Sequence, residues 1–138
     1  MSKRKIPQQD HNISVQDWLS KLNALSSDIS TWARRQSGWT VDASSKEITE
    51  ETLGSYSAPV LNINAETGRL KLEPVALNVL GGKGAVELYA WPTLYRVRLI
   101  GNSQNNDWRI LTDSGIYLSE EWNEKNFITL AQNLIGVE

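Results

Sequence analysis

The residues with the clearest chemical potential are arginines and aromatic residues that alternate with apolar residues between positions 87 and 109. A guanidinium group binds carboxylates and phosphates through paired N–H donors, and it also stacks on aromatic rings. A cluster of such cations with two rings and one acid could bind a carboxylate, a phosphate or a peptide. The candidate binding residues are Arg96, Arg98, Arg109, Glu87, Tyr89 and Trp91. The alternative interpretation is that these side chains form ordinary cross-strand pairs on a solvated sheet.

Patterns typical of catalysis or metal binding are missing elsewhere in the sequence. The chain has no cysteine, and its single histidine, His11, lies in a polar N-terminal segment, which argues against nucleophilic catalysis. The segment Gly81–Gly84 lacks the first glycine of a phosphate-binding loop and the hydroxyl residue after its lysine, so we interpret it as a turn. Two acidic clusters are interpreted as solvated charge: Glu47, Glu50 and Glu51, and Glu120, Glu121 and Glu124. We therefore expect no catalytic residue, no metal and no cofactor.

A β-hairpin, predicted over Ala85–Ile100 with its turn at Pro92 and Thr93, must position the candidate residues. A single register sorts the residues of this hairpin onto two faces, as a half-buried hairpin requires. The apolar face pairs Val86 with Leu99, Leu88 with Val97 and Ala90 with Tyr95. The opposite face pairs Glu87 with Arg98, Tyr89 with Arg96 and Trp91 with Leu94.

The alternation of apolar and polar residues continues on both sides of this hairpin. Matching the apolar faces pairs Leu77 with Leu88 in the preceding strand and Val97 with Ile110 in the following one. The apolar positions change parity at Pro74, which indicates a β-bulge. Further alternating segments begin near Trp39, Leu61 and Leu70, whereas residues 44–57 show no clear pattern.

A long helix is predicted over Ser14–Gln36, where apolar residues recur at three- and four-residue spacing. Ser14 is a suitable N-cap residue, and Asp17 then falls in the first turn. The apolar stripe consists mainly of Trp18, Leu22, Leu25, Ile29 and Trp32. Its width favours packing on a sheet, but the residues also fit a heptad, so pairing with a second copy remains an alternative. A second helix is predicted over Asn123–Ile135, ending at Gly136.

The length of 138 residues suits one domain, and the 14 basic against 16 acidic residues give a net charge of −2. We expect residues 1–12 to form a flexible tail and residues 13–138 a single α+β domain. This domain would contain a long N-terminal helix, an antiparallel β-meander of about five to six strands and a C-terminal helix. No apolar run approaches the ~20 residues of a membrane helix, and no secretion signal is recognisable, so we expect a cytoplasmic protein.

Two functions are compatible with these patterns. The favoured one is a non-enzymatic, soluble interaction module, similar in size and layout to chaperone, immunity or accessory proteins, that acts through an exposed sheet face. Its partner would be a second copy, giving a homodimer, or another protein. The near-neutral charge argues against nucleic acid as the main partner, and no membrane is expected. The alternative is binding of a small anionic ligand or single-stranded nucleic acid at the arginine and aromatic patch.

Overall fold

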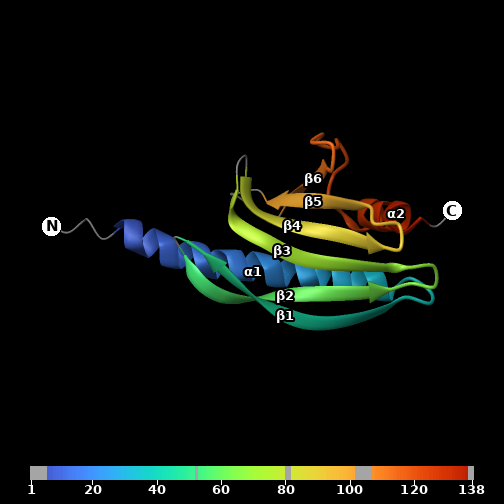
Figure 1. The fold of residues 1–138 in the computed structure, drawn as a ribbon, viewed down its shortest axis with the longest axis horizontal. Coiled ribbons are helices and arrows are strands. Elements are labelled where there is room, and N and C mark those ends of the chain that lie inside the picture. Colours follow the sequence, from blue (N-terminus) through green and yellow to red (C-terminus); the bar gives the residue numbers. More distant parts are fainter. Residues whose placement is uncertain (1–5, 52, 80–81, 102–106, 137–138) are drawn as a thin grey trace.

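The computed structural model describes residues 6–51, 53–79, 82–101 and 107–136 (Figure 1). The chain forms an N-terminal helix, six strands and a C-terminal helix, which confirms the predicted α+β class. The strands lie in chain order in one antiparallel sheet. The elements are α1 (Ile6–Arg34), β1 (Thr40–Glu50), β2 (Gly54–Asn64), β3 (Arg69–Val79), β4 (Gly82–Trp91), β5 (Arg96–Gly101), β6 (Trp108–Thr112) and α2 (Glu124–Ile135).

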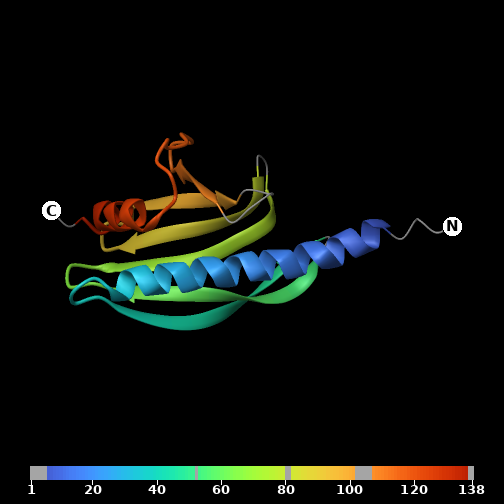
Figure 2. The same cartoon turned by 180° about the vertical axis from the view of Figure 1, so that it is seen from behind.

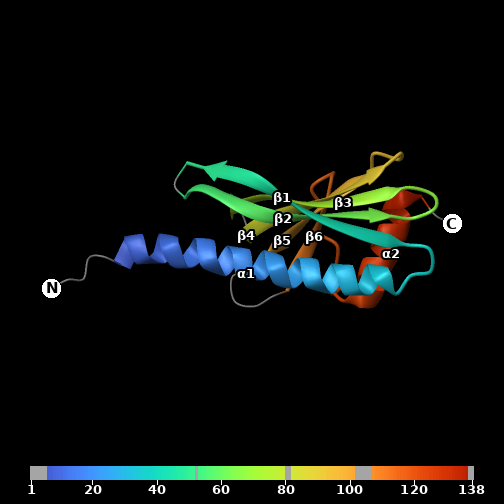
Figure 3. The same ribbon diagram turned by 90° about the horizontal axis from the view of Figure 1, so that it is seen from below.

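Both helices lie on the same side of the sheet. Figures 2 and 3 show α1 running along that side, with α2 beside its C-terminal end. α1 packs on β1, β2 and β3, and α2 packs on β3 and β4. We call the helix-covered side the inner face and the opposite side the outer face. In the described part of the chain, no helix is long and apolar enough to cross a membrane.

The apolar stripe of α1 is buried within its own chain. Trp18, Leu22, Leu25 and Ile29 are each 2 % exposed or less, so this stripe packs on the sheet rather than serving as a seam for a second copy. The predicted start of the helix is wrong, because α1 begins at Ile6 and no acidic residue lies in its first turn. Pro7 suits the first turn of a helix, since the N–H that it lacks has no helical partner there.

Gly84 lies inside β4, not in a turn as predicted, because β4 begins at Gly82. It has a φ of +97°, and a Cβ at this position would lie 2.2 Å from the ring of Trp18. The absence of a side chain at Gly84 therefore allows Trp18 to pack directly on the sheet. Trp18 also contacts Trp108, with 6.3 Å between the ring centroids, and it donates from Nε1 to the hydroxyl of Tyr56 at 3.0 Å.

The β4–β5 hairpin has the predicted register, with Val86 opposite Leu99 and Leu88 opposite Val97. Two neighbouring registers differ from those expected. Leu88 faces Leu72 instead of Leu77, and Leu99 faces Ile110, which shifts the last strand by two residues. A bulge between Pro74 and Ala76 shifts the alternation of buried and exposed positions, so that both Leu72 and Leu77 are buried. Alternation alone therefore could not show which of the two faces Leu88.

The turn between β4 and β5 also differs from expectation. Tyr95 was predicted to face the core opposite Ala90, but it is 60 % exposed. Tyr95 does lie opposite Ala90, whose N–H donates to the Tyr95 carbonyl oxygen at 2.8 Å, but β5 begins only at Arg96, and Leu94 before it has a φ of +67°. The hydroxyl of Thr93 donates to the carbonyl oxygen of Leu134 at 2.5 Å, which fixes this turn to the end of α2.

Within the segment 44–57, which showed no clear pattern, the described residues 44–50 and 54–57 belong to the long β1–β2 ladder. The β2–β3 ladder is much shorter, because it joins only Leu61–Asn64 to Arg69–Leu72. Farther along, side chains replace backbone pairing. The carboxylate of Glu50 accepts from the backbone N–H of Leu77 at 2.9 Å and from the hydroxyl of Tyr56.

The C-terminal helix has the predicted ends. Asn123 accepts from the backbone N–H of Asn126 at 2.9 Å, as an N-cap residue does, and Gly136 takes the left-handed conformation that closes the helix. Phe127 of α2 packs against Trp32 and Trp122, with 5.7 Å between ring centroids in each case. These contacts attach α2 to the end of α1.

Candidate binding site on the outer face

The ladder places all six predicted site residues on the outer face. On β4 and β5, Leu88, Val97 and Leu99 belong to the buried core, so the residues that alternate with them point away from the helices. Glu87 faces Arg98, and Tyr89 faces Arg96, as predicted. Trp91 follows on the same face of β4, and Arg109 on β6 faces Ile100, which is the next outer residue of β5.

Tyr89 lies between two cations on neighbouring strands. Lys71 of β3 faces it on one side, and Arg96 of β5 faces it on the other. The guanidinium carbon of Arg96 lies 5.6 Å from the centroid of the Tyr89 ring, which is within the range of a cation–π contact. The ring of Tyr89 is therefore partly occupied within its own sheet.

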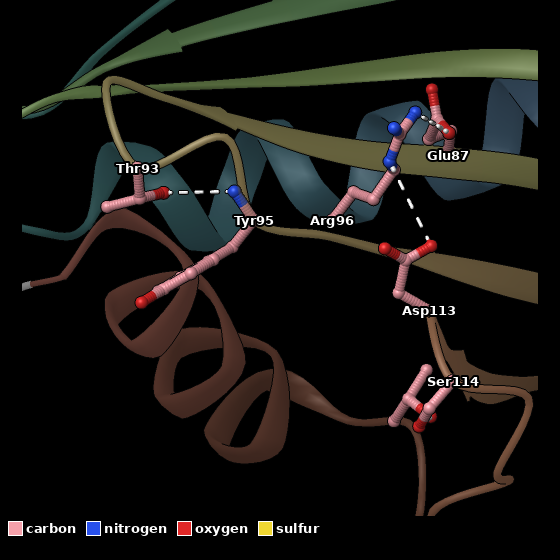
Figure 4. Close-up of polar contacts among 7 residues, drawn as sticks. Glu87, Thr93, Tyr95, Arg96, Asp113 and Ser114 are labelled. Atoms are coloured by element: carbon pink, nitrogen blue, oxygen red, sulfur yellow. Dashed lines mark hydrogen bonds and ion pairs between the residues drawn. The ribbon is translucent and has the colours of Figure 1, made fainter.

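Arg96 lies between two carboxylates. Its Nη1 is 3.4 Å from the carboxylate of Glu87, and its Nε is 4.0 Å from that of Asp113, which follows β6 (Figure 4). Glu87 lies opposite Arg98 in the ladder, but its carboxylate pairs diagonally with Arg96. Both ion pairs are at least partly exposed, so each contributes little to stability.

Arg98 differs from its neighbour Arg96. Its side chain is exposed, and among the described residues it has no ion pair, hydrogen bond or aromatic contact. Beside it is a hollow of about 280 Å³ between β5 and the turn after β6. The lining residues are Glu87, Arg96, Val97, Arg98, Leu111, Thr112, Asp113 and Gly115. The hollow thus brings together three of the predicted residues: Arg96, Arg98 and Glu87.

Arg109 and Trp91 share the face but do not line this hollow. The guanidinium carbon of Arg109 lies 3.7 Å from the centroid of the Tyr117 ring, so this cation already has an aromatic partner. Trp91 is 51 % exposed at the far end of β4, beside the exposed turn residues Leu94 and Tyr95. The predicted cluster is therefore one extended surface with a hollow at one side.

Several residues of the outer face were missed by the sequence prediction. Arg69, Lys71 and Glu73 of β3 face Trp91, Tyr89 and Glu87, respectively. Their alternation with Leu70 and Leu72 was visible in the sequence, but the wrong β3–β4 register separated them from the site. On β3–β6, this face carries five described cations, Arg69, Lys71, Arg96, Arg98 and Arg109, and two carboxylates, Glu73 and Glu87. The face is therefore basic in a chain of net charge −2.

The residues that the structure describes include no group of three or more His, Asp or Glu side chains placed to hold a metal ion. Comparison of the chain with protein-family models, curated proteins and solved structures finds no match. The chemistry of the outer face is therefore the basis for a functional proposal.

Proposed function

We propose that this protein is a non-enzymatic interaction module, comparable to a chaperone, immunity or accessory protein, that binds a partner protein through its outer face. The observation that carries the proposal is the asymmetry of the sheet. Two helices cover the inner face (Figure 3). The outer face, by contrast, displays five described cations on β3–β6 and the half-exposed Trp91. Tryptophan and arginine are the residues most enriched at the energetic centres of protein interfaces.

Affinity capture from the cells that express the protein tests this proposal. Lys71→Glu reverses a charge in the middle of the outer face, and Lys125→Glu makes the same change on α2. We expect one or more proteins to be retained by the wild type and by Lys125→Glu but lost with Lys71→Glu. Equal retention of all captured proteins by the two variants would contradict the proposal.

The hollow beside Arg98 favours a second candidate function, binding of a small anionic ligand. At about 280 Å³ it is slightly smaller than the pockets that hold drug-sized ligands, so a phosphate or a small carboxylate would fit. A ligand at 100 times its Kd stabilises the folded state by about 2.7 kcal/mol. A titration with inorganic phosphate should therefore raise the melting temperature, and an unchanged melting temperature at millimolar phosphate would argue against this candidate.

A further inference from the structure

We propose that Arg98 and the hollow beside it bind a carboxylate side chain from an acidic segment of the partner protein. This inference rests on the proposed function, because it names the chemistry of the partner that the outer face recognises. Three observations support it: the state of Arg98, the charge balance of the hollow, and the arrangement of the remaining outer-face residues.

The first observation is that the guanidinium of Arg98 is available to bind an external anion. Its ladder partner is Glu87, but the Glu87 carboxylate lies 3.4 Å from Arg96. Arg98 makes no ion pair or hydrogen bond with any described residue and is exposed beside the hollow. A guanidinium presents paired N–H donors that match the two oxygens of a carboxylate.

The second observation is that both acids lining the hollow contact Arg96 rather than Arg98. Glu87 and Asp113 both lie within ion-pair distance of Arg96, at different nitrogens of its guanidinium, Nη1 and Nε (Figure 4). Two cations and two acids line the hollow, so its formal charge is zero, but both acids contact Arg96 and no carboxylate of the described residues forms an ion pair with Arg98. Leu111, which faces Arg98 in the ladder, adds an apolar surface against which the methylene groups of a glutamate side chain could pack.

The third observation distinguishes an acidic peptide from single-stranded nucleic acid. Nucleic-acid platforms need free aromatic faces and a continuous basic path for the phosphates. Here Arg96 covers part of Tyr89, and Glu73 lies directly opposite Glu87 in the centre of the face. Glu87, Tyr89 and Trp91 of β4 also separate the cations of β3 from those of β5, so these described residues form no continuous basic path. Carboxylates spaced along a peptide can instead reach Arg69 and Arg98 separately.

Fluorescence anisotropy with labelled peptides tests the inference. The probe is a fluorescein-labelled peptide of alternating Glu and Ser, and its control has Gln in place of each Glu. We expect the Glu peptide to bind the wild type, more weakly as salt increases, and the Gln peptide not to bind. Arg98→Ala should weaken binding of the Glu peptide about tenfold, as the loss of a charge-assisted contact does.

Two further variants make the result specific to Arg98. Arg98→Lys keeps the charge without the planar pair of donors, so it should also lose several-fold in affinity. Arg35→Ala removes an exposed arginine of the α1–β1 turn, which pairs with Glu124, and should change affinity less than twofold. Because these side chains are exposed, the substitutions should leave the melting temperature unchanged, and that result would show that every variant folds.

The inference is overturned if Arg98→Ala binds the Glu peptide as well as the wild type does, or if a labelled ten-nucleotide oligothymidylate binds more tightly than the peptide. Its failure is distinguishable from failure of the proposed function. If Lys71→Glu still abolishes capture of a protein while Arg98→Ala has no effect on the peptide, only the carboxylate site is wrong. If Lys71→Glu leaves capture unchanged, the outer-face function itself fails.

Discussion

At the scale of single residues, Gly84 is a position where packing excludes any side chain. An alanine Cβ would lie 2.2 Å from Cζ3 of Trp18, and the backbone φ of +97° is strained for any residue other than glycine. We expect Gly84→Ala to lower the free energy of unfolding by about 3–5 kcal/mol, because overpacking and backbone strain act together. Urea denaturation measures this change.

Gly115 provides the matched control. Its φ of +87° is similar, but no atom lies within 4 Å of the Cβ that a substitution would add. Gly115→Ala should therefore show the backbone cost alone, about 1–2 kcal/mol. If both variants lose the same stability, the contact between Trp18 and Gly84 has no energetic role beyond the backbone conformation.

Tyr56 connects the buried Trp18 to the partly buried Glu50. Its hydroxyl accepts from Nε1 of Trp18 at 3.0 Å and donates to the carboxylate of Glu50. Tyr56→Phe keeps the ring but leaves the indole N–H of Trp18 without its acceptor. We expect a loss of about 1–3 kcal/mol in the free energy of unfolding, measured by urea denaturation. A loss below about 0.5 kcal/mol would mean that water replaces the hydroxyl.

The same tyrosine should make stability depend on alkaline pH. Burial, followed by the hydrogen bond to Glu50, raises the pKa of Tyr56 well above its ordinary value of 10. The folded state therefore retains this proton when the unfolded state has lost it, so the stabilising contribution is present below pH 10 and declines as the pH rises further. In unfolding titrations above pH 10, the wild type should lose stability more steeply than Tyr56→Phe. Parallel slopes would contradict this assignment.

At the scale of elements, the contribution of α1 can be measured at Leu25. This residue is 2 % exposed in the middle of the buried stripe. Leu25→Ala should cost about 2–5 kcal/mol, because it removes buried apolar surface and leaves a cavity. Asn23→Ala, on the exposed side of the same helix, should change stability by less than about 0.5 kcal/mol. An equally small effect at Leu25 would show that the helix contributes little to the core.

The elements also show what the sequence could and could not predict. Regular alternation predicted β4 and β5 with their register, because one face of each strand is buried and the other is not. β1 could not be predicted in full, because it is an edge strand whose residues are mostly exposed on both faces, so no alternation marks its second half. The β3–β4 register failed at the bulge after Pro74, where an extra residue changes the pairing but leaves apolar residues buried.

For the candidate site, the pattern predicted which residues share a face but not how they pair. Whether Glu87 pairs with Arg96 or with Arg98 depends on side-chain conformation. The position of Asp113 depends on the turn after β6. Neither property can be inferred from the spacing of residues in the sequence. The isolation of Arg98 therefore became visible only in three dimensions.

At the scale of the whole molecule, self-association remains a prediction. The exposed Trp91 and the low net charge of −2 both favour it, and two-fold dimers are the commonest soluble oligomers. We expect sedimentation at micromolar concentration to show a species of about twice the 15.5 kDa chain mass. Trp91→Ala should shift the equilibrium towards the monomer if Trp91 lies at the interface. A monomer at all concentrations would contradict the dimer.

The sheet consists of two leaves, β1–β2 and β3–β6, which are joined by a β2–β3 ladder of only four residue pairs. The β1–β2 leaf is otherwise held by α1 and by side-chain bridges such as Glu50 to Leu77. Such a leaf can open as a cooperative unit without unfolding β3–β6. In native-state hydrogen exchange, the amides of β1 and β2 should therefore exchange together, and at a lower opening free energy than those of β4. Exchange of all six strands at one common free energy would show instead that the sheet opens only as a whole.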